Sequence, residues 1–391
     1  MEVKKERLLF FLINMNLGGT ERSFLNLLSE LPEHYVIDLL LLEEYGELLK
    51  DVPENVQIHI LKNNTEIKEF LKFGNRGFAI KELQRGRFLS FIKNMTVWVL
   101  LKLKLLKHPF YGVSHYLKEF DESYDNAIAF AGIHNFIAYF TLNYIQARKR
   151  FLWIHFDVTK IGFNTQFANH FYDKFQKVIC VSQVVKTNLI KSLTIDISSK
   201  LEVVHNVLDL EEIEIKSKQK DIHWNPDIVQ VLTVGRLSAE KGHADFLPVI
   251  RKLKQKKLKF KWWIIGDGKE RPKIERIIQE LNLSDYVEVL GKKENPFPYY
   301  KACDIYLQPS KYEGHCVSII EAKYFNKPIV SNNFAGITDE IENGYNGLIC
   351  DMNFDSQYKA LKKMIEDKAL RKRFVNNLSN EPKKMFKNPF E

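Results

Sequence analysis

The chain has 391 residues and a formal net charge of +9 at pH 7, and its composition is 45% hydrophobic and 27% charged. This length favours two or three domains, and the composition excludes disordered, collagen-like and low-complexity proteins. The apolar runs are short or broken by lysine, so we expect no membrane-spanning helix. The four cysteines have no C-x-x-C spacing, which disfavours a zinc site and favours a reducing compartment. We therefore expect a cytoplasmic protein.

The positive charge indicates acidic partners, such as phosphorylated small molecules, an anionic membrane or nucleic acid. Part of the excess is local, because residues 81–107 contain seven Lys or Arg against one acid. A solvated surface would explain such a run equally well.

Apolar strand-like runs alternate with helix-period segments along nearly the whole chain. Most of these runs are continuously apolar, which predicts parallel strands covered by helices on both faces. In chain order the predicted strands are 8–13, 36–42, 56–60, 127–130, 151–156, 178–181 and 201–204 in the first half, and 229–234, 262–265, 287–290, 305–307, 329–330 and 348–349 in the second.

The pattern predicts two α/β domains separated by a short linker. Residues 1–208 form the first domain and 228–375 the second. The polar stretch 209–227 has weak periodicity and a late proline, and we interpret it as the linker. Residues 376–391 form a tail, which we expect to pack back on the first domain.

Two glycine-containing loops follow predicted first strands. Gly18 and Gly19 precede a helix pattern, and a helix N-terminus after a strand can hold an anion, although a simple tight turn explains them equally well. In the second half, Arg236 and Lys241 follow the strand at 229–234, at the sheet edge where ligands bind. Two such cations suit a diphosphate, or they are solvated charges before a helix.

A later loop carries two carboxylates. Glu313-Gly314 forms a turn after the strand at 305–307, and a helix from Cys316 onward places Glu321 about two turns in. Both carboxylates could accept hydrogen bonds from sugar hydroxyls. The pair also suggests a glycosidase, but that chemistry leaves the cations and the Gly-Gly loop unexplained. His155 closes a predicted strand. A lone histidine is more often structural than functional, but this position at the carboxyl edge of a sheet improves the odds of a functional role.

These segments together resemble the retaining glycosyltransferases of family 4, which have the GT-B fold. The resemblance covers almost the whole chain in the family's order and rests on GGTERSFLNLL (18–28), WIHFD (153–157), HNVLD (205–209), GRLSAEKG (235–242), GDG (266–268), EGHCVSIIEA (313–322) and ENGYNGLIC (342–350). It implies two Rossmann-like domains facing each other across a cleft. The second would hold a nucleotide sugar and the first an acceptor.

The resemblance also implies roles for individual residues. Arg236 and Lys241 would bind the donor diphosphate, Glu313 the sugar hydroxyls, and Glu321 the ribose. His155 would lie beside the reacting sugar. Further donor contacts would come from Gly18, Gly19, Gly266, Leu290, Gly314, His315, Cys316 and Val317.

The implied reaction moves a hexose or N-acetylhexosamine from a nucleotide-diphosphate sugar, expected to be a UDP-sugar, to a saccharide acceptor, with retention of the anomeric configuration. A lipid-linked acceptor in the synthesis of a surface polysaccharide such as capsule or exopolysaccharide fits many bacterial relatives. Because two cations can stabilise the leaving diphosphate and no D-x-D triad is present, we expect no catalytic metal and no cofactor.

Residues 85–107 are a candidate contact for an anionic membrane surface. Within 88–107, Lys93, Thr96, Lys104 and Lys107 fall near one helical face, as in a basic amphipathic helix. A core helix with lysines reaching to solvent would show the same pattern. Membrane contact would make the protein peripheral at the inner face of the cell membrane.

Other functions remain as alternatives. An epimerase of nucleotide sugars shares the fold and would consume donor without any acceptor. A non-catalytic basic binding protein is a further alternative, but no nucleic-acid-binding motif is present, so we expect no nucleic-acid partner. A nicotinamide oxidoreductase is disfavoured, since no G-x-G-x-x-G follows the first strand.

Overall fold

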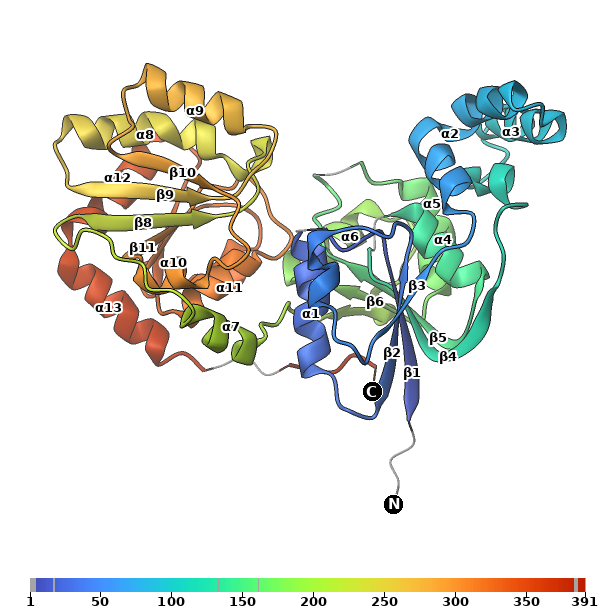
Figure 1. Cartoon of the computed structure of the whole chain (residues 1–391), viewed down its shortest axis with the longest axis horizontal. Helices are drawn as coiled ribbons and strands as arrows, with labels where there is room; N and C mark the ends of the chain where they lie inside the picture. Colours follow the sequence, from blue (N-terminus) through green and yellow to red (C-terminus); the bar gives the residue numbers. More distant parts are fainter. Residues whose placement is uncertain (1–4, 17, 132–133, 161, 383–385, 391) are drawn as a thin grey trace. The chain divides into compact units, whose positions relative to one another are not determined.

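The computed structural model describes the chain except residues 1–4, 17, 132–133, 161, 383–385 and 391. The described residues form two compact units (Figure 1). Unit 1 comprises residues 1–205 and 387–391, and unit 2 comprises residues 206–386. Each unit is built around its own parallel β-sheet.

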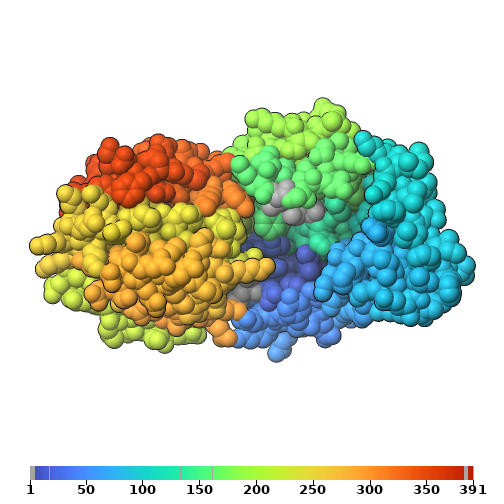
Figure 2. All heavy atoms as spheres, turned by 90° about the horizontal axis from the view of Figure 1, so that it is seen from above, coloured from blue at the N-terminus to red at the C-terminus, as the bar shows by residue number. Residues whose placement is uncertain are grey.

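The sheet of unit 1 has the strand order β3-β2-β1-β4-β5-β6-β7, with every described pair parallel. Its strands are β1 (Glu6–Leu12), β2 (Tyr35–Leu41), β3 (Gln57–Ile60), β4 (Phe120–Ala129), β5 (Ile145–Ile154), β6 (Lys177–Cys180) and β7 (Leu201–Val203). Its helices are α1 (Gly19–Glu30), α2 (Asn64–Gln84), α3 (Phe88–Lys102), α4 (Asn135–Asn143), α5 (Thr165–Phe171) and α6 (Gln183–Ser192). Helices α2 and α3 form a hairpin at the margin of this unit (Figures 1 and 2).

The sheet of unit 2 has the order β10-β9-β8-β11-β12-β13 and is also parallel. Its strands are β8 (Val229–Val234), β9 (Phe260–Ile265), β10 (Val287–Gly291), β11 (Ile305–Gln308), β12 (Ile329–Asn332) and β13 (Gly347–Cys350). Its helices are α7 (Leu210–Ser217), α8 (His243–Gln255), α9 (Arg271–Glu280), α10 (Phe297–Ala302), α11 (Val317–Tyr324), α12 (Phe354–Glu366) and α13 (Lys368–Ser379). Two apolar cores cover its faces, one with α8, α9, α12 and α13, the other with α7, α10 and α11.

In both sheets the strand order reverses beside the first strand, between β1 and β4 in unit 1 and between β8 and β11 in unit 2. Two neighbouring strands then send their chains to opposite faces, which opens a crevice at their carboxyl ends. The fold therefore places a candidate ligand site in each unit at the loops that follow these strands.

Each of the thirteen predicted runs overlaps one strand of the structure, which confirms the α/β class. The continuously apolar pattern identified them because parallel strands are buried on both faces, as the side chains from Leu8 to Leu12 in β1 are. Strands β4 and β5 begin at Phe120 and Ile145, earlier than predicted. The apolar pattern missed these starts because the first residues of both strands are largely polar and partly exposed.

The stretch predicted as a linker, 209–227, is part of unit 2. It contains helix α7, whose N-terminus is capped by Asp209 through a 2.8 Å hydrogen bond from the Glu212 backbone N–H. Ile213 is buried in the core of unit 2, and Trp224 stacks on Trp263 with ring centroids 5.0 Å apart. The weak periodicity was misleading because a few well-placed apolar side chains suffice to pack a short helix.

The structure divides the C-terminal segment at a different place from the predicted boundary at residue 376. Helix α13 continues to Ser379 within unit 2, whereas residues 387–391 belong to unit 1. There Phe390 is 2% exposed and packs with Phe10, Tyr35 and Phe151 at centroid distances of 5.4–6.2 Å. The end of the chain thus completes an aromatic cluster of the first unit.

We expect Phe390→Ala to lower the free energy of unfolding of unit 1 by about 3 kcal/mol, because it leaves a cavity among aromatic rings. Denaturant unfolding followed by fluorescence would measure this loss. Lys387→Ala is the control, since its ion pair with Glu202 is exposed and screened by solvent and therefore contributes little to stability. Equal effects of the two substitutions would contradict a packing role for Phe390.

Candidate functional site

The loops that follow β8 and β11 meet at Gly242. This glycine has a positive φ of 70°, and a Cβ atom placed on it would lie 2.2 Å from the carbonyl oxygen of Pro309. Only glycine permits this approach of the two backbones. The contact fixes the loop 235–242 against the loop 309–316, which carries most of the predicted donor-binding residues.

Lys241 and Glu313 form an ion pair across these two loops. The distance from Lys241 Nζ to Glu313 Oε1 is 2.6 Å, and the two side chains are 23% and 13% exposed. Burial by itself lowers the pKa of the Lys241 ammonium, but the charge of Glu313 and the hydrogen bond to it raise it more. The pKa of Lys241 therefore lies above its ordinary value, and the lysine is charged at neutral pH.

A polar network behind Glu313 holds one of its carboxylate oxygens. Oε1 accepts hydrogen bonds from Ser310 Oγ at 2.6 Å and from Gln308 Nε2 at 3.3 Å, in addition to Lys241. Oε2 has no hydrogen-bond partner among the residues that the structure describes. The carboxylate is thus fixed through one oxygen and can offer the other to a ligand.

Sequence analysis missed Gln308 as a member of this network. It is 2% exposed at the end of β11, and its side-chain oxygen accepts hydrogen bonds from Tyr306 OH and Ser318 Oγ at 3.0 and 3.2 Å. The available signal was a polar residue at the carboxyl end of an otherwise apolar strand beside the strand-order reversal.

Arg236 lies in the loop after β8 and is exposed, and its guanidinium makes no hydrogen bond or ion pair with another described residue. The backbone of the same loop packs closely against the loop that follows β9. Gly266 has a φ of 150°, and a Cβ there would lie 1.8 Å from the Gly235 carbonyl oxygen. Gly266 therefore acts by letting the loop after β9 approach the loop after β8. Leu290, in β10, packs against the second apolar core of unit 2.

Helix α11 begins later than predicted. Cys316 is its N-cap and Val317 its first residue, so Glu321 lies little more than one turn into the helix, not two. Glu321 Oε2 accepts a 2.7 Å hydrogen bond from Tyr300 OH. Burial raises the pKa of the Cys316 thiol to about 12, which keeps it neutral. The N-terminus of α11 directly follows Gly314, His315 and Cys316. Backbone N–H groups at a helix N-terminus favour the binding of anions.

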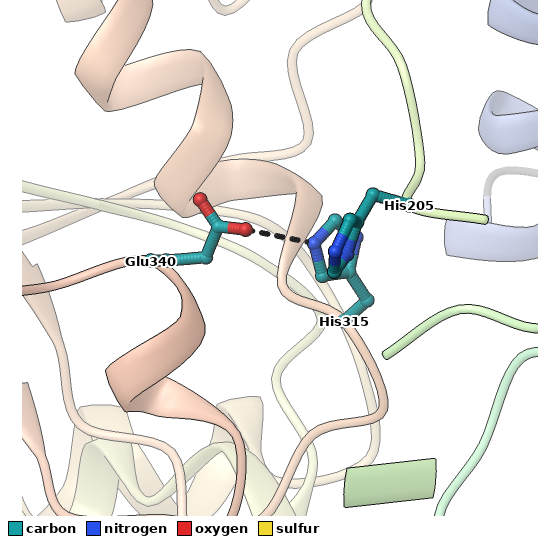
Figure 3. A group of neighbouring side chains, drawn as sticks. All are labelled: His205, His315 and Glu340. Carbon is teal, nitrogen blue, oxygen red and sulfur yellow. Dashed lines mark hydrogen bonds and ion pairs between the residues drawn. The ribbon is translucent and has the colours of Figure 1, made fainter. Parts of the chain in front are cut away.

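His315 is held in one orientation from two sides. Its Nδ1 accepts a hydrogen bond from the backbone N–H of Asn206 at 3.3 Å, and its Nε2 lies 3.0 Å from Glu340 Oε1 (Figure 3). Lys323 also contacts Glu340, at 3.5 Å. His205, labelled in the same figure, is the last residue of unit 1. The His315 side chain therefore tethers the donor loop to the start of unit 2.

The predicted residues of unit 1 lie at the carboxyl end of its sheet. Gly18 is the N-cap of α1, and a Cβ on Gly19 would meet open space, so the packing of unit 1 itself does not require glycine at Gly19. His155 directly follows β5, is 7% exposed and lies against the ring of Phe130 at 4.5 Å. How close these residues come to Lys241 and Glu313 stays a prediction.

One cluster within unit 1 has the composition of a metal site: Asp38, His59 and Glu122. However, the Arg7 guanidinium donates to Asp38 Oδ2 at 2.8 Å and also pairs with Glu122, while Tyr124 OH donates to Asp38 at 2.6 Å. Since the Arg7 guanidinium already pairs with both carboxylates, we interpret the cluster as a structural ion-pair network.

We expect Lys241→Met to lower the free energy of unfolding of unit 2 by about 2–3 kcal/mol, because it leaves the Glu313 carboxylate largely buried without its cation. The double variant Lys241→Met, Glu313→Leu should recover part of this loss, and denaturant unfolding of all four proteins gives the coupling energy. Because the pKa of Lys241 is raised above its ordinary value, its contribution is complete below that ordinary value and is lost only as the pH rises through the higher pKa of the folded state. Additive losses would contradict the pair.

Comparison with known proteins identifies the domain. Residues 214–380 match the family described as "Glycosyl transferases group 1". Over 97% of the chain and 95% of the relative, the sequence is 26% identical to an N-acetylgalactosamine-N,N'-diacetylbacillosaminyl-diphospho-undecaprenol 4-alpha-N-acetylgalactosaminyltransferase of Campylobacter jejuni. The finer assignment to family 4 stays a prediction.

Solved structures confirm the GT-B fold. HepE from Anabaena, in complex with UDP and glucose, superposes with a TM-score of 0.66 at 17% identity over 95% of this chain and 93% of its own. Sucrose-phosphate synthase from Thermosynechococcus elongatus gives the same score at 13% identity over 96% and 93%. At these identities the likeness concerns the fold alone.

Proposed function

Since the chain is a glycosyltransferase whose residues 214–380 match group 1, we propose that it moves a hexose or N-acetylhexosamine from a UDP-sugar to a lipid-linked saccharide. The observation that carries the donor half is the Lys241–Glu313 pair beside Arg236, at the carboxyl ends of β8 and β11. The Campylobacter relative, whose name describes transfer to a diphospho-undecaprenol-linked saccharide and which aligns along nearly its whole length, supports the acceptor half. The product would belong to a surface polysaccharide.

The two cations suit a diphosphate in different ways. Arg236 is exposed and can offer a planar pair of N–H groups to phosphate oxygens. Lys241 is a largely buried point charge with three N–H donors, so it can keep Glu313 and donate to a phosphate at the same time. The N–H groups at the start of α11 add further donors to the same anion.

Glu313 would bind the donor sugar through Oε2, the oxygen that the network leaves open. Because Oε1 is held by Ser310, Gln308 and Lys241, the carboxylate loses little freedom when a sugar hydroxyl binds. Glu321 would accept a hydrogen bond from the ribose while its Oε2 stays bonded to Tyr300.

In the proposed reaction the bond between the anomeric carbon and the diphosphate oxygen breaks, and a bond to the acceptor hydroxyl forms on the same face. A leaving-group oxygen takes the hydroxyl proton. Because the new bond forms on the same face as the broken one, the anomeric configuration is retained. Arg236 and Lys241 offset the charge that grows on the diphosphate, and His155 would lie beside the reacting sugar. An inverted anomer in the NMR spectrum of the product would contradict this mechanism.

We propose that the cations do the work of a metal, so that transfer needs neither metal nor cofactor. The epimerase alternative would convert the donor without acceptor, which an assay omitting the acceptor distinguishes. No described helix meets the length and hydropathy that a membrane span needs. A cytoplasmic location stays a prediction.

We expect UDP to stabilise the purified protein in the presence of EDTA, by about 2.7 kcal/mol at a hundredfold excess over Kd. A thermal-shift titration measures this, and Arg236→Ala and Lys241→Ala should each lose most of the shift. Arg251→Ala is the control, because this exposed arginine lies on α8, nine residues beyond the loop 235–242. A shift that needs divalent metal, or that survives both site variants, would overturn the assignment.

Ser310→Ala should weaken binding of the UDP-sugar roughly fivefold and leave binding of UDP unchanged, because it removes one hydrogen bond that fixes the sugar-binding carboxylate. Titration calorimetry with both ligands separates the two effects. Ser379→Ala, which removes a surface hydroxyl of α13, is the matched control. An equal loss for UDP would mean that Glu313 positions the diphosphate site and not the sugar.

A further inference from the structure

The α2–α3 hairpin of unit 1 buries polar side chains between its helices. Asn94 is fully buried, and its side chain donates to the carbonyl oxygens of Ser90 and Gly112 at 3.0 and 3.1 Å. Asn75 donates to Asn94 Oδ1 at 3.2 Å. Glu82 is also fully buried and accepts a 2.6 Å hydrogen bond from Tyr116 OH.

The outer surface of the same hairpin is apolar. Nine of the 21 exposed large apolar side chains among the described residues lie in this one region. They are Phe73, Ile80, Leu83, Phe88, Leu89, Ile92, Val99, Leu103 and Leu105, of which Leu89 is 86% and Phe88 64% exposed. Leu89, Ile92 and Val99 follow one another at helical spacing on α3, whereas Phe73 and Ile80 lie on either side of the kink that α2 makes at Gly74. Although Phe70, Phe78 and Val97 are buried within the hairpin, so many exposed apolar side chains in one region indicate an apolar surrounding for the outer face.

The charge of the hairpin is strongly positive. Residues 64–107 contain ten Lys or Arg and three acids, a difference of +7 out of the +9 of the whole chain. The three acids are paired within the hairpin: Glu66 with Arg87, Glu69 with Lys81 and Arg85, and Glu82 with Arg85 and Arg87.

Of the remaining cations, Lys68 pairs with Glu43, and three others lie beside aromatic rings. Arg76 and Lys102 lie over the ring of Trp98 at 5.5 and 4.4 Å from its centroid, and Lys72 lies over Phe73 at 5.2 Å. Cations that border exposed apolar side chains are the pattern of a helix lying in the interface of an anionic bilayer.

The structure corrects the predicted basic face of residues 88–107. Lys93 is half-buried, and its Nζ donates to Ser114 Oγ at 2.8 Å, so it does not belong to the surface. Lys104 lies beyond the end of α3, with a φ of 58°. The alternative of a core helix is wrong for the exposed residues Phe88, Leu89 and Ile92.

We infer that the outer face of residues 73–105 docks on an anionic lipid bilayer, with Phe88 and Leu89 entering the headgroup region and Arg76, Lys72, Lys102 and Lys104 contacting lipid phosphates. A protein partner is disfavoured because the face offers many cations and no unpaired acid among the described residues. Neither helix meets the criteria for spanning, so the hairpin lies on the membrane. This inference goes beyond the proposed transfer reaction and holds whatever the donor.

The test is flotation of the full chain with vesicles of phosphatidylcholine containing 40% phosphatidylglycerol, compared with phosphatidylcholine alone. We expect binding to the anionic vesicles and a strong decrease at high salt. Phe88→Ser with Leu89→Ser should weaken binding at least tenfold, because both side chains lose their apolar contact. Lys102→Gln with Lys104→Gln should weaken it roughly tenfold, because two cations near the surface are removed.

Matched controls come from unit 2. Lys256→Gln with Lys257→Gln removes two exposed cations at the end of α8, and Lys257, like Lys104, has a positive φ of 56°. Met352→Ser with Phe354→Ser removes two exposed apolar groups. Equal losses in these controls, or no binding by the unchanged protein, would overturn the inference. A different result would also overturn it: the protein self-associates, the double variant Phe88→Ser with Leu89→Ser abolishes this self-association, and vesicle binding is unaffected. The thermal shift with UDP, measured on each variant, reports separately on the donor site.

Discussion

The donor end of unit 2 depends on the close approach of two backbones at Gly242 and Pro309. Because no side chain fits between them, the loop after β8 and the loop after β11 are fixed at a single separation. Lys241 precedes this contact directly, and Ser310 follows it directly, so both reach Glu313 from a rigid position. The geometry of the charged groups is thus set by a steric constraint of the main chain.

That constraint gives the two oxygens of Glu313 different surroundings. Three donors of the protein hold Oε1, and Oε2 is left to a ligand. If Oε2 binds the donor sugar, as proposed, positioning of this kind lowers the entropy that binding costs. Gln308 supports this position of Glu313 indirectly, because its side chain is hydrogen-bonded to Glu313, Tyr306 and Ser318.

Most of the excess positive charge of the chain lies in the hairpin region, and not in the loops of unit 2 where we propose the donor site. The hairpin region 64–107 carries +7 of the total +9, which leaves +2 for the rest of the chain. The donor site proposed for unit 2 would therefore rely on individually placed cations, Arg236 and Lys241, beside compensating acids. On the hairpin, in contrast, the proposed membrane contact would combine exposed cations with exposed apolar groups.

The sequence by itself determined the strands and the order of the motifs, because a parallel strand buried on both faces must be continuously apolar and because GRLSAEKG and EGHC follow strands directly along the chain. Only the tertiary structure decided that 209–227 belongs to unit 2, that Lys93 faces Ser114, and that Gln308 supports Glu313. Each of these depends on how elements pack in three dimensions, and a pattern along the chain reports the burial of a residue but not its partner.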